Sequence, residues 1–566
     1  MTTITILPPR AATLKMSADN WVLLAGTTLI AIWLVVTLAA PLAVLLIKSV
    51  QNADGDFVGL ANYARYFETP ALVQSLWNSI WVSLLTTFIV IPLAFGYAYA
   101  LRRTAMPLKP LFVALALLPI FAPSLLSALS FIYIFGNQGF LRSLLMGETI
   151  YGPIGIVMSM VFYTFPHALL VLMTALALAD QRHYEAAKVL GTPARRIFWT
   201  VTLPGAKYGL ISAAFIVFTL SVTEFGIPKV IGGQFNVMAT DAYKQVVGQQ
   251  NFEMGAVVGF VLLIPAILAF AVDRIVQRRQ VALLSARAVP LVPERNRTVD
   301  AAATVYCLLV GGLIAAIIGV AIWASFITYW PYNLSLTLKN YNFGNYDSAG
   351  WKSYWNSILM SSIVAVLGTA FIFVGAYLVE KGRGLAFGRN LIQLLAMLPM
   401  AVPGLVLGLA YIFFINNQWN PLGFLYGTIL VLAVNSIAHF YTVAHMTAIT
   451  ALKQVDPEFE SVSSSLKVPQ YRTFQRVTVP ICLPAILDIA VYLFVNALTT
   501  VSAVIFLYGA NTKLASIAIV HMDEAGFTAS AAAVATILFL TALGVKIAHL
   551  LLDRLVFSRF QAWRRR

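Results

Sequence analysis

Twelve apolar stretches divide the sequence, and each is long enough to cross a lipid bilayer as a single helix. An α-helix rises about 1.5 Å per residue, so about 20 apolar residues cross the hydrocarbon core. The stretches cover approximately residues 22–47, 75–101, 111–136, 153–178, 207–231, 254–273, 303–327, 353–379, 391–415, 425–449, 483–507 and 527–552. Because backbone groups inside lipid must bond to one another, this pattern predicts an all-α polytopic membrane protein with about 12 transmembrane helices.

The composition excludes several classes of protein. Hydrophobic residues make up 60% of the 566 residues and charged residues 10%, whereas a soluble domain carries about 25% charged residues. A soluble enzyme, a disordered chain and a nucleic-acid-binding protein are therefore excluded. The two cysteines, Cys307 and Cys482, lie far apart and cannot form a disulfide framework or a metal site, so the sequence predicts no metal ligands.

The distribution of basic residues predicts the orientation of the chain. If the N-terminus lies in the cytoplasm, 28 of the 37 Lys and Arg residues fall in cytoplasmic segments and 8 fall in outer loops. Positively charged loops stay on the cytoplasmic side of a membrane. We therefore predict that both termini are cytoplasmic.

The second half of the sequence repeats motifs of the first half. The motif Trp-Asn-Ser-Ile begins at Trp77 and again at Trp355, and the pair Asn-Tyr begins at Asn62 and again at Asn340. Each repeat holds six stretches, an even number, so the two halves run parallel across the membrane. We expect a cytoplasmic tail at 1–20, a first six-span unit at 21–274, a cytoplasmic linker at 275–300 and a second six-span unit at 301–566.

In each half, the longest predicted cytoplasmic loop joins the fourth and fifth stretches. The first of these loops contains Glu185, Ala186 and Ala187, followed by Gly191. Small alanines leave a helix face on which another protein can pack closely, and glycine permits a sharp turn. In the second loop Lys467 occupies the glycine position, so the sequence leaves the shape of that turn open.

These loops resemble the EAA loop of ATP-binding-cassette importer permeases of the binding-protein-dependent type, with two permease units fused in one chain. In that family the loop docks onto an ATPase subunit. The resemblance assigns docking to Glu185, Ala186, Ala187 and Gly191 in the first copy, and to Glu460, Ser461, Ser463 and Lys467 in the second. It implies the type I importer permease fold, with two parallel six-helix repeats, in the bacterial cytoplasmic (inner) membrane.

The sequence contains no Gly-x-x-x-x-Gly-Lys-Ser/Thr phosphate loop. We therefore expect that the chain is not an enzyme and holds no cofactor, and that ATP and Mg are bound by partner subunits. The resemblance implies two copies of an ATPase subunit and an extracytoplasmic solute-binding protein as partners.

At a finer level, residues 226–236, 396–404 and 439–445 resemble permeases for 2-aminoethylphosphonate uptake, which makes this small polar solute the expected substrate. A ferric-iron or polyamine permease of the same family is the alternative. An ion-coupled secondary transporter also fits twelve spans in two parallel halves. Such a transporter would need buried ion-coupling groups, and it would not need docking loops. A membrane enzyme would need a catalytic cluster facing one side, and the sequence offers none.

A few polar residues fall inside the apolar stretches, where a charge is costly. Thr223 and Glu224 lie late in the fifth stretch, and Thr499, Thr500 and Ser502 hold the matching places in the repeat. We expect these five residues to meet near the pseudo-twofold axis and to line the substrate path.

Glu224 has two interpretations. Its carboxylate could attract an ammonium group or brace a helix kink. Alternatively, it lies near the outer water interface and is satisfied by backbone groups or by Lys229. Proline pairs at positions 119 and 123 and at positions 399 and 403 predict a kink or an interruption in the third and ninth stretches.

Overall fold

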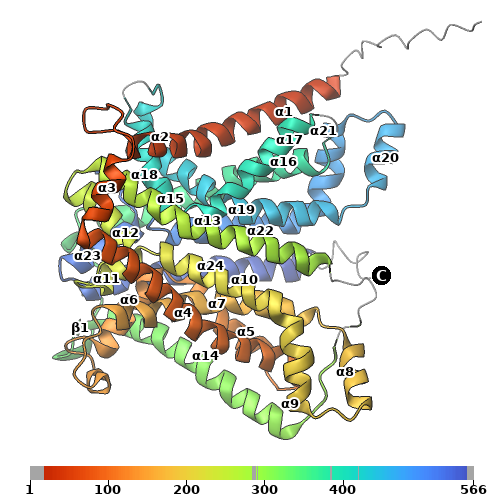
Figure 1. Ribbon diagram of the computed structural model, residues 1–566, viewed down its shortest axis with the longest axis horizontal. Coiled ribbons are helices and arrows are strands. Elements are labelled where there is room, and N and C mark those ends of the chain that lie inside the picture. Colours follow the sequence, from red (N-terminus) through yellow and green to blue (C-terminus); the bar gives the residue numbers. More distant parts are fainter. Residues whose placement is uncertain (1–17, 283–288, 290, 383–384, 418–419, 558–566) are drawn as a thin grey trace, which may run out of the picture.

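The computed structural model describes residues 18–282, 289, 291–382, 385–417 and 420–557, and most of them are helical (Figure 1). Ten helices in this part are long and apolar enough to cross a membrane, and two bent helix pairs raise the number to twelve. The predicted all-α fold with about 12 spans in two repeats is therefore confirmed. Most of the predicted N-terminal tail and part of the linker lie outside the described residues.

The helices of the first half are α1 (Ala18–Leu34), α2 (Ala40–Ser49), α3 (Ala61–Glu68), α4 (Pro70–Arg103), α5 (Lys109–Leu117), α6 (Ser124–Phe135), α7 (Pro153–Ala177), α8 (Gln181–Val189), α9 (Ala194–Ile197), α10 (Leu203–Thr223), α11 (Gly226–Ile231), α12 (Met238–Tyr243) and α13 (Phe252–Ala282). A single π-helical turn, Val35–Ala39, joins α1 to α2, so the two form one span.

The second half begins with α14 (Arg297–Ser325) and a short antiparallel hairpin, β1 (Ile327–Tyr329) and β2 (Asn333–Leu336), in which Ile327 faces Leu336. Its remaining helices are α15 (Trp351–Ile363), α16 (Thr369–Glu380), α17 (Ala386–Met397), α18 (Gly404–Ile415), α19 (Ile429–Lys453), α20 (Glu458–Ser465), α21 (Gln470–Thr473), α22 (Val479–Thr499), α23 (Ala515–Glu524) and α24 (Thr528–Leu552).

Matching hydrogen bonds show the repeat in three dimensions. In α4, the Ser79 hydroxyl oxygen accepts the backbone N–H of Met238, the first residue of α12, at 2.8 Å. In α15, the Ser357 hydroxyl oxygen accepts the N–H of Ala515, the first residue of α23, also at 2.8 Å. The first N–H groups of a helix have no partner within it. The same serine of the repeated motif therefore fixes the start of the same short helix in each half.

The first span of each half packs on the other half. α1 lies against α16 and α17, and α2 contacts both α13 and α18, whereas α14 lies against α4, α5 and α6 (Figure 1). The ring of Trp33 in α1 stacks on that of Phe371 in α16, with 5.3 Å between the centroids. The two halves therefore interlock.

The bundle has two different ends (Figure 1). We call the end that carries α8, α9, α20 and α21 the basic end, and the opposite end, with α3, α11, α12, α23 and the β-hairpin, the far end. Both predicted docking loops lie at the basic end.

Two proline pairs break the third and ninth spans. A 3-10 turn, Leu118–Phe121, separates α5 from α6, which meet at 100°, and a second such turn, Leu398–Ala401, separates α17 from α18, which meet at 115°. The residue before a proline avoids the helical conformation, and Ala122 and Val402 are extended, with ψ of 139° and 114°. The predicted interruptions are confirmed, and they free backbone groups at these two places.

Candidate functional site

The first docking loop, residues 180–202, contains α8 and ends this helix in a sharp turn. The Asp180 side chain accepts the backbone N–H of Arg182 at 3.1 Å and so caps the start of α8. After the helix, Gly191 has a φ of +69°, and its N–H donates to the carbonyl oxygen of Lys188 at 2.9 Å. Glycine adopts this left-handed conformation without strain. The sharp turn expected at Gly191 is present.

The second docking loop, residues 456–478, forms the same turn without glycine. Lys467 has a φ of +54°, and its N–H donates to the carbonyl oxygen of Ser464 at 3.1 Å. A side chain in this left-handed region costs about 1 kcal/mol. Loop length and backbone hydrogen bonds therefore shape the turn, and Lys467 adopts it under strain.

Both docking loops expose large apolar side chains at the basic end. Val189 and Leu190 are 87% and 81% exposed in the first loop, and Val462 and Leu466 are 56% and 70% exposed in the second. Grouped apolar side chains on a surface indicate a binding site for another protein. Among the predicted docking residues, those exposed beside them are Glu185, Ala186, Gly191, Ser461 and Lys467, and those partly buried are Ala187, Glu460 and Ser463.

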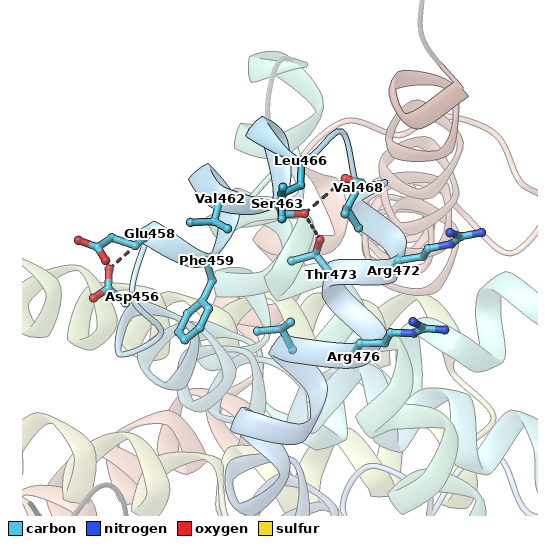
Figure 2. A pocket seen from close by; sticks show the side chains of 11 residues that line it. Asp456, Glu458, Phe459, Val462, Ser463, Leu466, Val468, Arg472, Thr473 and Arg476 are labelled. Carbon is cyan, nitrogen blue, oxygen red and sulfur yellow. Dashed lines mark hydrogen bonds between the residues drawn. The ribbon is translucent and has the colours of Figure 1, made fainter.

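A hollow of about 520 Å³ lies beside α20 in the second docking loop (Figure 2). It is lined by Asp456, Glu458, Phe459, Val462, Ser463, Leu466, Val468, Arg472, Thr473, Arg476 and Val477. The Ser463 hydroxyl bonds to the hydroxyl of Thr473 and donates to the carbonyl oxygen of Val468 at 3.4 Å, which joins α20 to α21. Figure 2 shows the carboxylates at one side of the hollow and the guanidinium groups at the other.

The linker holds the first docking loop. The backbone N–H of Gln181, at the start of α8, donates to the carbonyl oxygen of Val289 at 2.9 Å. Lys188, near the end of α8, pairs with Glu294 at 2.5 Å. The part of the linker that the structure describes therefore runs along the first docking helix.

A largely buried ion pair holds the second docking loop. Lys381, just after α16, lies 3.2 Å from the carboxylate of Glu460 and donates to the carbonyl oxygen of Val455 at 3.1 Å. The side chains of Lys381 and Glu460 are 10% and 14% exposed. Glu460 therefore anchors α20 from inside instead of lying on its exposed face.

α10 and α22 end at matching places on the predicted path. The hydroxyls of Thr223 and Thr499 each donate to the carbonyl oxygen four residues earlier, at 2.8 and 3.0 Å. The next residues, Glu224 and Thr500, are extended, with ψ of 132° and 138°. Thr223 and Thr499 are therefore the last residues of their helices, and Glu224 and Thr500 begin the extended segments that follow. The two threonine hydroxyls are bonded within their own helices.

Glu224 connects a broken span to a short helix. Its Oε1 accepts the hydroxyl of Ser124, the first residue of α6, at 2.7 Å, and the backbone N–H groups of Gly226 and Ile227 at 3.1 and 3.4 Å. A carboxylate in this position caps the free N–H groups at the start of α11. Lys229 pairs with Glu524 instead, so Lys229 does not satisfy Glu224. The geometry matches a brace at a break, and backbone N–H groups satisfy the carboxylate, as one part of the second interpretation expects.

Neutral polar groups occupy the matching place in the second half. Gly404 begins α18 as Ser124 begins α6. A Cβ atom on Gly404 would come within 2.8 Å of the Ser502 hydroxyl oxygen and 3.0 Å of His439 Nε2, so glycine allows this close approach. The half that lacks a counterpart to Glu224 therefore places a serine and a histidine against its broken span.

Ser124 and Gly404 are site residues that the sequence analysis does not identify. Each directly follows the second proline of a broken span, and this position is the signal in the sequence that marks them. Within the residues that the structure describes, no group of three or more His, Cys, Asp or Glu side chains could hold a metal ion.

Comparison with known proteins relates both halves to one family. The family model described as binding-protein-dependent transport system inner membrane component matches residues 89–281 and 381–558, and each region contains one docking loop. The chain is 28% identical over 480 residues to a putative ferric transport system permease protein, FbpB 1, of Haemophilus influenzae, covering 81% of this chain and 74% of the relative.

Two further relatives differ in how much of the chain they cover. A ferric transport system permease protein, FbpB, of Actinobacillus pleuropneumoniae is 28% identical over 513 residues, covering 87% of this chain and 73% of the relative. A putative 2-aminoethylphosphonate transport system permease protein, PhnU, of Salmonella choleraesuis is 22% identical over 284 residues, covering 48% of this chain and 97% of the relative.

Proposed function

Because the chain belongs to the family of binding-protein-dependent transport system inner membrane components, we propose that it forms the whole membrane part of an ATP-driven importer for ferric iron. The observation that carries this proposal is the coverage of the relatives. The similarity to ferric permeases extends over 81% and 87% of the chain, and so over both halves. The similarity to the 2-aminoethylphosphonate permease covers 48% of the chain at lower identity. The comparisons therefore favour ferric iron over the substrate expected from the sequence.

The two ends of the bundle have different roles in this proposal. The basic end lies in the cytoplasm because positively charged loops stay there. Each docking loop binds one ATPase subunit through its exposed apolar side chains, and these subunits bind ATP and Mg. The far end receives the solute from an extracytoplasmic binding protein.

The chemistry of the path is compatible with a cation. Glu224 lies beside a break and carries a carboxylate, and the neutral groups of Ser502 and His439 lie beside the other break. A carboxylate near the path attracts a metal cation, and it attracts the ammonium group of 2-aminoethylphosphonate as well, so the preference for iron rests on the coverage of the relatives. A path without a tight cluster of ligands also releases its solute, so high-affinity capture belongs to the binding protein.

Uptake in cells tests the proposed substrate. We expect deletion of this gene, in a strain without a second system, to lower the uptake of labelled ferric iron and to leave the uptake of labelled 2-aminoethylphosphonate unchanged. The opposite result would establish 2-aminoethylphosphonate as the substrate, and unchanged uptake of both would remove both. A purified chain without its partners should hydrolyse no ATP.

A further inference from the structure

An ion pair joins the two halves at the far end. Lys229 Nζ in α11 of the first half lies 2.5 Å from Glu524 Oε1 in α23 of the second half. The two other ion pairs that the structure describes at this end each stay within one half: Lys48–Glu253 and Lys513–Asp347. The Lys229–Glu524 pair is therefore placed to hold α11 against α23, which pack on each other.

One aromatic ring lies against the lysine of this pair. Lys229 Nζ lies 4.7 Å from the centroid of the Tyr243 ring, a distance at which the ring face attracts a cation. The Tyr243 ring in turn lies 6.0 Å from the ring of Phe506, which belongs to the second half. The Lys229 and Glu524 side chains are 18% and 44% exposed. The lysine is enclosed between the halves while its partner remains accessible to water.

The pair has no counterpart on the other side of the pseudo-twofold axis. Met238 and Ala515 hold equivalent places, because each begins a short helix and donates to the same serine of the repeat. Counted from these two residues, Lys229 corresponds to Phe506 and Glu524 corresponds to Val247. Two apolar residues cannot form an ion pair, so this contact is specific to one side of the far end.

The pair is also connected to the broken third span. Glu224 caps the start of α11 and accepts the hydroxyl of Ser124 at the break. Lys229 lies on the same six-residue helix, α11. One short helix therefore links the break in the first half to Glu524 in the second half.

We propose that the Lys229–Glu524 pair is a latch that holds the far end closed until the binding protein docks. This inference rests on the proposed function, because an importer must admit its solute between the two halves at this end. Opening there separates α11 from α23 and breaks the pair. A partly exposed ion pair is weak enough to break and re-form during each transport cycle.

ATP hydrolysis by the assembled complex tests the latch without reference to the substrate. The complex with its ATPase subunits, in liposomes and without binding protein, is compared with the variants Lys229→Met and Glu524→Gln. We expect each variant to hydrolyse ATP about two- to fivefold faster. Loss of a partly exposed ion pair changes the equilibrium constant between the closed and the open far end by about this factor. The reversed pair, Lys229→Glu with Glu524→Lys, should return the rate to that of the unchanged complex.

Lys244→Met is the matched control. Lys244 is also an outer lysine of the first half, but it bonds to Asn236 of its own half, so its loss should not change the rate. Single variants that hydrolyse ATP at the unchanged rate, or a reversed pair as fast as the single variants, would overturn the latch alone. If the complex without substitutions hydrolyses no ATP, with or without binding protein, the proposed function is overturned, and the latch with it.

A crosslink gives a second test that does not depend on removing the charges. With Lys229→Cys and Glu524→Cys joined by a reducible bis-maleimide, we expect the binding protein to stop stimulating ATP hydrolysis, and a reductant to restore the stimulation. Each single cysteine variant is the control, since the native Cys307 and Cys482 are buried. Full stimulation of the crosslinked complex would contradict the latch.

Discussion

The two docking loops have the same backbone and different supports. Each begins with an aspartate whose side chain accepts the backbone N–H two residues later, Asp180 at 3.1 Å and Asp456 at 2.9 Å. In each loop the first helix is followed by a left-handed residue, Gly191 or Lys467. The first loop is tied to the linker by an exposed ion pair, and the second is tied by a largely buried pair beside α16. Loop length and backbone hydrogen bonds therefore maintain the shape of both loops, while the side chains that support them differ.

The largest expected difference between the two docking loops is the stability that each supporting ion pair contributes. Lys381→Met leaves Glu460 buried without its partner, which should cost about 3 kcal/mol of stability. Lys188→Met removes an exposed pair with Glu294 and should cost under about 1 kcal/mol. Thermal unfolding of the purified chain measures both. Equal losses would contradict the assigned difference between the two supports.

The next largest difference is expected in solute uptake after substitutions at the two broken spans. Glu224→Gln removes the charge that strengthens three hydrogen bonds at the break, a loss of about 1–2 kcal/mol. We expect ferric-iron uptake to fall about tenfold, while the affinity of the external binding protein for iron stays unchanged. The matched variant in the second half is Thr500→Val, which removes a hydroxyl that takes no part in this network and should change uptake less than about twofold. Similar losses would show that the two breaks do not differ in function.

Substitutions at the two turns should change ATPase binding in opposite directions, with smaller effects. Gly191→Val places a β-branched residue at a positive φ, which should weaken ATPase binding about five- to tenfold. Lys467→Gly relieves strain at the matching turn, so ATPase binding should stay unchanged or tighten slightly. Binding of the ATPase subunit to each variant in detergent measures both effects. Equal weakening by the two changes would contradict the role given to the backbone.

The smallest expected effect concerns pH at the first docking loop. The side-chain hydrogen bond from Arg182 holds the pKa of Asp180 below its usual range. The stability that this carboxylate contributes is present above its unfolded-state pKa and is lost as the pH falls through its lower folded-state pKa. ATPase binding to α8 should therefore not change between pH 8 and pH 5 on account of Asp180. A loss in this window that Asp180→Asn removes would contradict this assignment.

Much of the fold follows from the sequence by simple rules. Span length and apolarity predict the twelve spans, the shared motifs predict the repeat, and the proline pairs predict the two breaks. These features depend on local chemistry. Proline lacks an N–H group wherever it occurs, and about 20 apolar residues cross a bilayer in any context.

Other features depend on contacts between segments that lie far apart in the sequence. The packing of α1 on the second half and of α14 on the first half has no signal in hydropathy, because an apolar face does not specify its neighbour. The partner of Lys229 is Glu524, which lies in the other half, and not the nearby Glu224. Glu460 matches a docking motif but turns inward because Lys381 is available to pair with it.

If one chain supplies both docking loops, one in each half, a single chain binds two ATPase subunits. Native mass spectrometry of the complex with its ATPase counts these subunits. We expect one permease chain with two ATPase subunits, and loss of one subunit when either loop is disrupted. A complex of two permease chains with two ATPase subunits would contradict this expectation.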